Sequence, residues 1–121
     1  MFKKFNNNPS GANIDDCFIR ATSLAVGIPY YDMMDELIEN ADNKNFKENS
    51  LLNLLDVLAP KGWTLYKIEE RKTVKQMAEM LGDGKYLIVT TNHITCSVDG
   101  DVYDTWNCNR YKALYYFIKE D

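Results

Sequence analysis

The segment NHITCSVDGDVYDTW, residues 92–106, contains the only histidine of the 121-residue chain. Asp99 and Gly100 form a dipeptide that is typical of the two-residue turn of a β-hairpin. Apolar or β-branched residues alternate with polar ones on both sides of this dipeptide, as in half-buried strands. The segment therefore predicts an antiparallel hairpin, with His93 at the beginning of its first strand.

The turn also predicts the register of this hairpin. A two-residue turn pairs Val98 with Asp101, Thr95 with Asp104 and His93 with Trp106, and paired residues share one face of the sheet. The residues expected on the opposite face are Ile94, Cys96, Val98, Tyr103 and Thr105. Asp104 is then diagonal to His93, about 7–8 Å away between backbones, which a side-chain hydrogen bond can span. This arrangement predicts a carboxylate that orients an imidazole, as in a catalytic triad, with Trp106 against the ring.

Cys17, about 75 residues before His93, is the candidate nucleophile. It stands at the start of a segment whose apolar residues recur at helical spacing: Ile14, Phe18, Ala21, Ala25 and Ile28. Asp15 or Asp16 is placed to cap this helix, and Gly27 is placed to end it. A cysteine at a helix start, a single histidine and a strand carboxylate are the components of a cysteine nucleophile site.

The charges around Cys17 act in opposite directions. A helix N-terminus stabilises a thiolate through its free amides and its dipole, and Arg20 adds positive charge on the same helix face. The carboxylates of Asp15 and Asp16 oppose a thiolate unless they cap backbone amides or pair with Arg20. The sequence leaves this conflict open. Asn13 is the candidate oxyanion donor besides the Cys17 amide, and Asn107 is the alternative to Asp104 for orienting the imidazole.

The remaining elements predict an α+β fold in which N-terminal helices pack on a C-terminal antiparallel sheet. Residues 1–13 read as an irregular arm, and residues 41–45 as a polar loop. The other helices are expected over residues 31–40, from Asn49 or Ser50 to a stop at residues 60–62, and from a Thr73 cap to residues 82–84. The strands are expected at residues 63–68, 85–91, 93–98, 102–106 and 113–118, the last four as a meander.

Size and composition exclude several classes of protein. The chain is expected to form one domain over residues 1–121. Its net charge of −4 argues against binding to nucleic acid or to an anionic membrane surface. No apolar stretch approaches the ~20 residues of a membrane span, and the N-terminus lacks the apolar core of a signal peptide. The chain is therefore expected in the cytoplasm.

The three cysteines have no CxxC spacing, which fits free thiols in a reducing compartment. A zinc site would have to gather Cys17, His93, Cys96 and Cys108. Because residues 93 and 96 are three apart on one strand, their side chains point to opposite faces. We therefore expect no metal and no cofactor, with Cys96 facing the core and Cys108 structural or incidental.

These motifs carry a resemblance to the papain-like cysteine peptidases in the broad sense. The matching residues are Asp16-Cys17 at a helix start, His93, and the segment Tyr103-Asp104-Thr105-Trp106. The most similar members are the compact bacteriocin-processing peptidases with a Cys-His-Asp triad and the NlpC/P60 hydrolases. Small bacteriophage and host proteins also share an Asp-Cys-x-x-Arg-Ala opening. The resemblance implies a papain-like fold in which Cys17 attacks an acyl carbon, His93 is the base and Asp104 orients it.

The leading hypothesis is a cysteine hydrolase that cleaves an amide, isopeptide or thioester bond in a protein or peptide through an acyl-enzyme on Cys17. The alternative is a phage or mobile-element protein that keeps this scaffold and binds a protein of its host, in whose cytoplasm it works. The absence of a glutamine shortly before Cys17 fits that alternative. A transglutaminase-like acyl transferase uses the same three residue types. The structural alternatives also stay open: Cys17 as a buried thiol, His93 as a core or surface histidine and Asp104 as a cross-strand partner. The oligomeric state is left open.

Overall fold

The computed structural model describes residues 1–12 and 14–120 of the chain. Its helices are α1 (Cys17–Val26), α2 (Tyr30–Lys44), α3 (Leu51–Leu58) and α4 (Val74–Leu81), and a short 3-10 turn spans Ala59–Lys61. Its strands are β1 (Phe2–Lys4), β2 (Trp63–Thr73), β3 (Lys85–Val89), β4 (Ile94–Val98), β5 (Asp101–Asp104) and β6 (Lys112–Lys119). The fold is α+β, as the sequence predicts.

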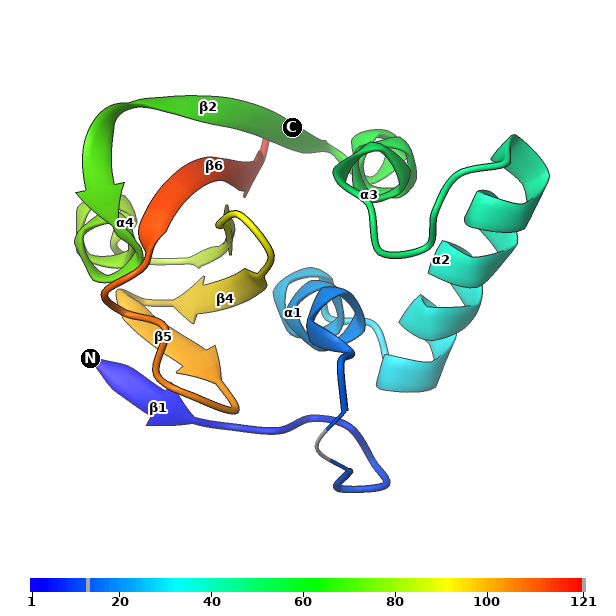
Figure 1. Ribbon diagram of the computed structural model, residues 1–121, viewed down its shortest axis with the longest axis horizontal. Coiled ribbons are helices and arrows are strands. Elements are labelled where there is room, and N and C mark those ends of the chain that lie inside the picture. Colours follow the sequence, from blue (N-terminus) through cyan, green and yellow to red (C-terminus); the bar gives the residue numbers. More distant parts are fainter. Residues whose placement is uncertain (13, 121) are drawn as a thin grey trace.

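All six strands form one mixed sheet in the order β1-β5-β4-β3-β6-β2 (Figure 1). The pair of β1 and β5 is parallel, and the other neighbouring pairs are antiparallel. β2 is long and curved, and its pairing with β6 shifts register between Lys67 and Lys72, as at a β-bulge. The sheet thus extends from the N-terminal strand at one edge to the curved β2 at the other.

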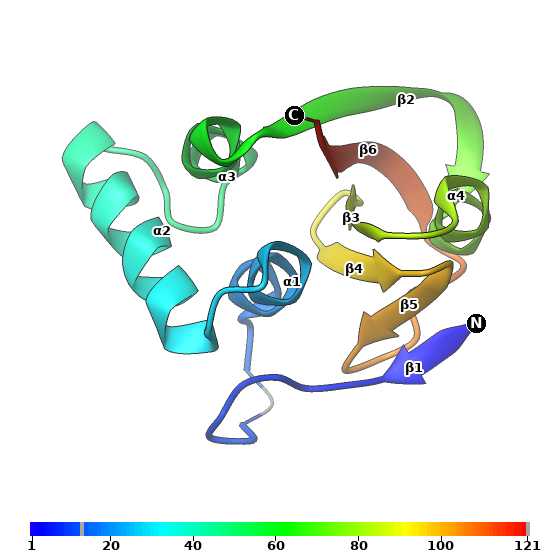
Figure 2. The same ribbon diagram turned by 180° about the vertical axis from the view of Figure 1, so that it is seen from behind.

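Helices cover both faces of this sheet. α1, α2 and α3 lie on one side and α4 on the other, as Figure 1 and the reverse view in Figure 2 show. The core under α1–α3 includes Ala21, Met33, Leu54, Leu87, Ile94, Cys96 and Phe117. The core under α4 includes Val74, Met77, Ile88, Val102, Cys108 and Ala113. Because adjacent strand residues alternate between the faces, Leu87 and Ile88 belong to different cores.

The helix ends follow the local signals in the sequence. Ser50 caps α3 by accepting a hydrogen bond from the Asn53 amide. Thr73 and Gln76 form a capping box at the start of α4. Gly27 ends α1 in the left-handed conformation that glycine adopts without steric cost. These three predicted helix boundaries are confirmed.

Two segments that were predicted to be irregular are regular in the structure. The predicted arm contains β1, which pairs with β5, and the Met1 amino group also lies 3.1 Å from the Asp101 carboxylate. Pairing of this kind depends on a distant strand edge and leaves no local pattern. The predicted loop at residues 41–45 continues α2 to Lys44, because Ala41 extends the buried helix face and only Asn45 turns left-handed.

The predicted sheet also needs correction. β3, β4 and β5 form the expected meander, but β6 returns to pair with β3 on its other side. The edge of β5 is taken by β1 instead, so the sheet is mixed and not purely antiparallel. The strand predicted at residues 63–68 continues to Thr73 and leads directly into α4.

In the described part of the chain, no helix combines the length and the apolar character that crossing a bilayer demands.

Candidate active site

The predicted hairpin forms with the predicted register. Val98 pairs with Asp101 and Cys96 pairs with Tyr103 across β4 and β5. Asp99 and Gly100 have φ angles of 52° and 88°, as in a two-residue turn with two left-handed positions. The backbone of the turn therefore places His93, just before β4, beside the end of β5, where Asp104 lies.

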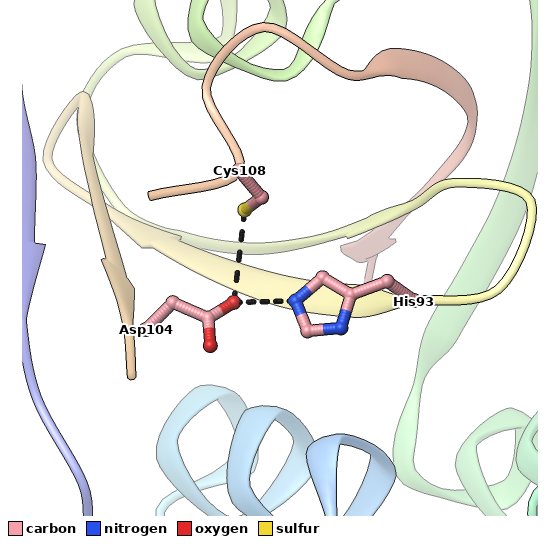
Figure 3. Close-up of side chains that lie close together, drawn as sticks. All are labelled: His93, Asp104 and Cys108. Carbon is pink, nitrogen blue, oxygen red and sulfur yellow. Dashed lines mark hydrogen bonds and ion pairs between the residues drawn. The ribbon is translucent and has the colours of Figure 1, made fainter. Parts of the chain in front are cut away.

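His93 and Asp104 are joined directly. His93 Nε2 lies 2.6 Å from Asp104 Oδ2, and the two side chains are 9% and 1% exposed (Figure 3). The Trp106 ring packs on the imidazole at a centroid distance of 4.7 Å, as the register predicts. The sequence-predicted carboxylate thus meets the histidine in a site that is largely closed to water.

Cys17 approaches the same imidazole from α1. It is the first residue of the helix, and the helix packs against β4. Cys17 and His93 line one cavity, and the Cys17 thiol contributes to raising the pKa of His93. Because Asp104 occupies Nε2, the ring nitrogen left for Cys17 is Nδ1. The structure therefore brings Cys17, His93 and Asp104 together in one site.

The site favours a charged imidazole beside a charged carboxylate. Burial opposes the protonated form of His93, but the hydrogen bond to Asp104, the neighbouring thiols of Cys108 and Cys17 and the charge of Asp104 outweigh it. Together they raise the pKa of His93 to about 11. Burial likewise opposes the ionised form of Asp104, but hydrogen bonds from His93 and Thr95 and the charge of His93 lower its pKa to about 2. The pair is an imidazolium–carboxylate ion pair at neutral pH.

A buried network holds Asp104 in place from behind. Arg20 Nη1 lies 3.1 Å from Asp104 Oδ1, and the Arg20 Nε donates to Asp16 Oδ1. Asp16 Oδ2 in turn accepts hydrogen bonds from Tyr30 Oη at 2.7 Å and from Asn8 Nδ2 at 3.0 Å. Arg20 therefore links the helix that carries the nucleophile to the strand that carries the acid.

This network resolves the charge conflict around Cys17. Asp16 occupies the cap position of α1, which is one of the two predicted positions, but its side chain makes no capping hydrogen bond. The two carboxylate oxygens of Asp16 accept hydrogen bonds from Arg20, Tyr30 and Asn8 instead. The guanidinium neutralises the carboxylate, which is one of the two conditions under which the sequence allows a thiolate at Cys17. Asp15 is exposed at the rim of the site.

Two candidate residues remain, Asn13 and Asn107. Asn13, the predicted oxyanion donor, lies outside the described residues. Asn107 is exposed, and its Oδ1 accepts a hydrogen bond from the Asn109 amide at 3.0 Å, so Asp104 is the residue that meets His93. The Cys17 amide is the first of α1, and the first amides of a helix lack partners within the helix. This amide is therefore a candidate oxyanion donor, as the sequence predicts.

Cys108 is a member of the site that the sequence does not reveal. It is fully buried, and its Sγ lies 3.7 Å from Asp104 Oδ2 (Figure 3). It comes from the irregular connection between β5 and β6, where no periodic pattern predicts the direction of a side chain. The roles of Asn8 and Tyr30 are equally hidden, because both contact Asp16 only through the tertiary fold.

Two cavities border the imidazole. One of about 520 Å³ is lined by Cys17 and His93 together with apolar residues that include Phe18, Leu51 and Tyr115. The other, of about 400 Å³, is lined by His93, Trp106 and Tyr111. Both share the loop Thr90–His93 and Asp15, so they adjoin one another beside the reactive groups. A chain-like ligand lying across both would pass the Cys17 thiol.

A thiol at a helix start, an imidazolium and a carboxylate in series can support attack of sulfur on an acyl carbon and protonation of the leaving group.

Scans against models of protein families and searches of curated proteins and of solved structures return no match to this chain.

Proposed function

We propose that this protein is a cysteine hydrolase of papain-like architecture that cleaves an amide, isopeptide or thioester bond. One observation carries the proposal: Asp104 lies 2.6 Å from one nitrogen of His93, while Cys17, at the start of α1, lines the same cavity as that ring. Each group has the chemical type and the neighbour that nucleophilic catalysis by cysteine requires.

In the proposed reaction, the Cys17 thiolate attacks the acyl carbon and forms a tetrahedral intermediate. The Cys17 amide donates a hydrogen bond to the developing oxyanion. The intermediate collapses as the His93 imidazolium protonates the leaving group, which leaves an acyl-thioester on Cys17. A water molecule deprotonated by His93 then attacks the thioester, and the thiolate departs. Asp104 holds the ring in one orientation and stabilises its positive charge throughout.

The arrangement of elements supports the papain-like part of the proposal. Cys17 stands at the N-terminus of a helix that packs on a sheet, His93 directly precedes strand β4 of that sheet, and Asp104 ends the neighbouring strand β5. The resemblance of the sequence motifs implies the same division of roles. We assign the roles of nucleophile, base and orienting acid to Cys17, His93 and Asp104 on this basis.

The surroundings of the site fit a protein or peptide substrate. The two adjoining cavities of about 520 and 400 Å³ accommodate groups on both sides of the reacting bond. Apolar and polar side chains line both cavities, with the rings of Trp106 and Tyr111 in the smaller one, and this mixture suits a peptide chain. The three cysteines are free thiols, which fits our proposal of a reducing, cytoplasmic setting.

Covalent trapping tests this proposal directly. The reduced protein is incubated with a panel of acyl electrophiles that includes peptide aldehydes, vinyl sulfones and activated thioesters, and intact-protein mass spectrometry detects adducts. We expect one adduct per chain, located at Cys17 by peptide mapping and lost in Cys17→Ala. Cys96→Ala is the matched control, since Cys96 is fully buried in the core and lines neither cavity beside His93. If no electrophile labels Cys17 in the folded protein, the hydrolase proposal fails and a non-catalytic protein-binding role replaces it.

A further inference from the structure

The donor atoms of His93, Asp104 and Cys108 form a compact cluster. All lie within 4.8 Å of one another, and the three side chains point toward a common centre (Figure 3). They supply one imidazole nitrogen, one carboxylate oxygen and one sulfur. Zinc binds these three ligand types in proteins and accepts them in a single tetrahedral site. The hydrolase reaction uses only two of these residues, so the position of Cys108 is unexplained by it.

We propose that His93, Asp104 and Cys108 bind a thiophilic divalent cation, Zn²⁺, which replaces the His93–Asp104 hydrogen bond and reversibly inactivates the site. Binding itself does not depend on the proposed hydrolase activity. Only the inhibitory consequence rests on it.

The present distances are close to those of a tetrahedral zinc site. With ordinary zinc–ligand bonds, the sulfur–oxygen separation is about 3.6 Å and the nitrogen–oxygen separation is about 3.4 Å. Cys108 Sγ and Asp104 Oδ2 are already 3.7 Å apart. His93 Nε2 and Asp104 Oδ2 are 2.6 Å apart, so the ring must withdraw by less than about 1 Å to admit the ion. That movement is what breaks the contact between the imidazole and its orienting acid.

The carboxylate is already held in the orientation that a metal ligand needs. Asp104 Oδ1 accepts hydrogen bonds from Arg20 Nη1 at 3.1 Å and from the Thr105 amide at 2.7 Å. These contacts leave Oδ2 as the oxygen that faces His93 and Cys108. Outer contacts of this kind fix ligand geometry and strengthen metal binding.

The charge of the surrounding network suits a divalent cation. Asp16 and Asp104 carry two negative charges and Arg20 carries one positive charge, and all three side chains are buried. Binding of the ion releases the Nε2 proton of the His93 imidazolium and the Cys108 thiol proton to solvent, which leaves the group with a net charge of −2 (two carboxylates and one thiolate against one guanidinium). A divalent ion neutralises it, so a buried ligand set is not left with unbalanced charge. Of the three ligands, His93 borders the cavity of about 400 Å³, which gives an ion a path from solvent to the cluster.

Cobalt and zinc titrations of the full-length, reduced protein test the proposal without any substrate. Co²⁺ serves as the spectroscopic probe, and Zn²⁺ affinity is measured by its displacement. We expect one ion per chain with sulfur-to-cobalt charge-transfer absorption. Cys108→Ser and Cys108→Ala should both weaken Zn²⁺ binding by more than tenfold, because loss of an outer-shell partner alone costs about 10–100-fold. Near-ultraviolet circular dichroism establishes that each variant is folded.

Cys17→Ala and Cys96→Ala are the matched controls, and we expect both to retain the cobalt absorption. If the absorption is lost in Cys17→Ala and kept in Cys108→Ala, the ion sits on the nucleophile and the proposal is wrong. Absence of stoichiometric binding at micromolar Zn²⁺ also overturns it. The cobalt readout needs no catalysis. Cobalt binding together with failed covalent trapping of Cys17 would therefore support the metal site and contradict the hydrolase proposal.

Discussion

At the scale of single residues, Asp104 is the centre of the site. Its Oδ2 meets His93 and Cys108, and its Oδ1 meets Arg20 and the Thr105 amide. The contact with His93 is predictable from the sequence, because a two-residue turn and the period of a strand together fix it. The contact with Arg20 joins residues 84 positions apart, and no local pattern connects them. For Arg20, the sequence predicts only a positive charge near Cys17.

Replacement of Arg20 by methionine tests the buried network. Arg20→Met keeps the apolar stem but leaves the carboxylates of Asp16 and Asp104 without their shared cation. Removing one partner of a buried ion pair costs about 3–5 kcal/mol, so we expect a loss of that order in the free energy of unfolding by urea. Lys44→Met is the control, because its ion pair with Asp56 is exposed and should contribute less than about 1 kcal/mol. Equal losses in the two variants would contradict a structural role for the Arg20 network.

At the scale of elements, the hairpin of β4 and β5 determines the geometry of the site. Gly100 has a φ of 88° in its turn, where an added Cβ meets only the Ala78 carbonyl at 3.9 Å. Alanine at this position therefore introduces backbone strain without a clash. We expect Gly100→Ala to lower the free energy of unfolding by about 1–2 kcal/mol. Asp99→Asn is the control, since asparagine tolerates the left-handed conformation. Gly100→Ala with unchanged stability would show that the turn does not hold the register.

The elements also show what the sequence can and cannot predict. Helix boundaries marked by local chemistry were correct, as at Ser50, Thr73 and Gly27. β1 was missed because its partner strand lies about 100 residues away. The pairing of β6 with β3 joins Leu87 to Phe117, and no local pattern favours it over the expected pairing with β5. Cys17, His93 and Asp104 were found because each lies at an element end with its own local signal. Cys108 was not, since it lies in a connection without periodicity.

At the scale of the whole molecule, the ion pair of His93 and Asp104 predicts how stability depends on pH. The unfolded histidine loses its proton near pH 6.5, while the folded one keeps it up to about pH 11. The contribution of His93 to the free energy of unfolding is therefore at its full value below pH 6.5 and declines as the pH rises above it. On the acid side, the contribution of Asp104 to the free energy of unfolding is present above its ordinary pKa of 3.8. It is lost as the pH falls toward the folded-state pKa of about 2.

The comparison with His93→Gln isolates this contribution. In the presence of a chelator, the difference in free energy of unfolding between the two proteins should be largest between about pH 4 and pH 6. It should shrink on both sides of that window. Urea denaturation across the pH range measures the difference. A difference that stays constant from pH 4 to pH 10 would rule out the imidazolium–carboxylate pair.

The fold assembles the site from the two ends of the chain. α1 brings the thiol, the late hairpin brings the ring and the acid, and Arg20 joins the two parts.

If Cys17, His93 and Asp104 act as one unit, His93 and Asp104 make the Cys17 thiol more reactive. The rate at which iodoacetamide alkylates Cys17 below about pH 7 measures that reactivity. An ordinary thiol has a pKa near 8.5 and is mostly protonated below pH 7, so it reacts slowly there. We expect rapid alkylation in the native protein, strong slowing in His93→Ala and Asp104→Asn, and little change in Asp101→Asn on the same strand. Alkylation that is as slow in the native protein as in His93→Ala would contradict the account.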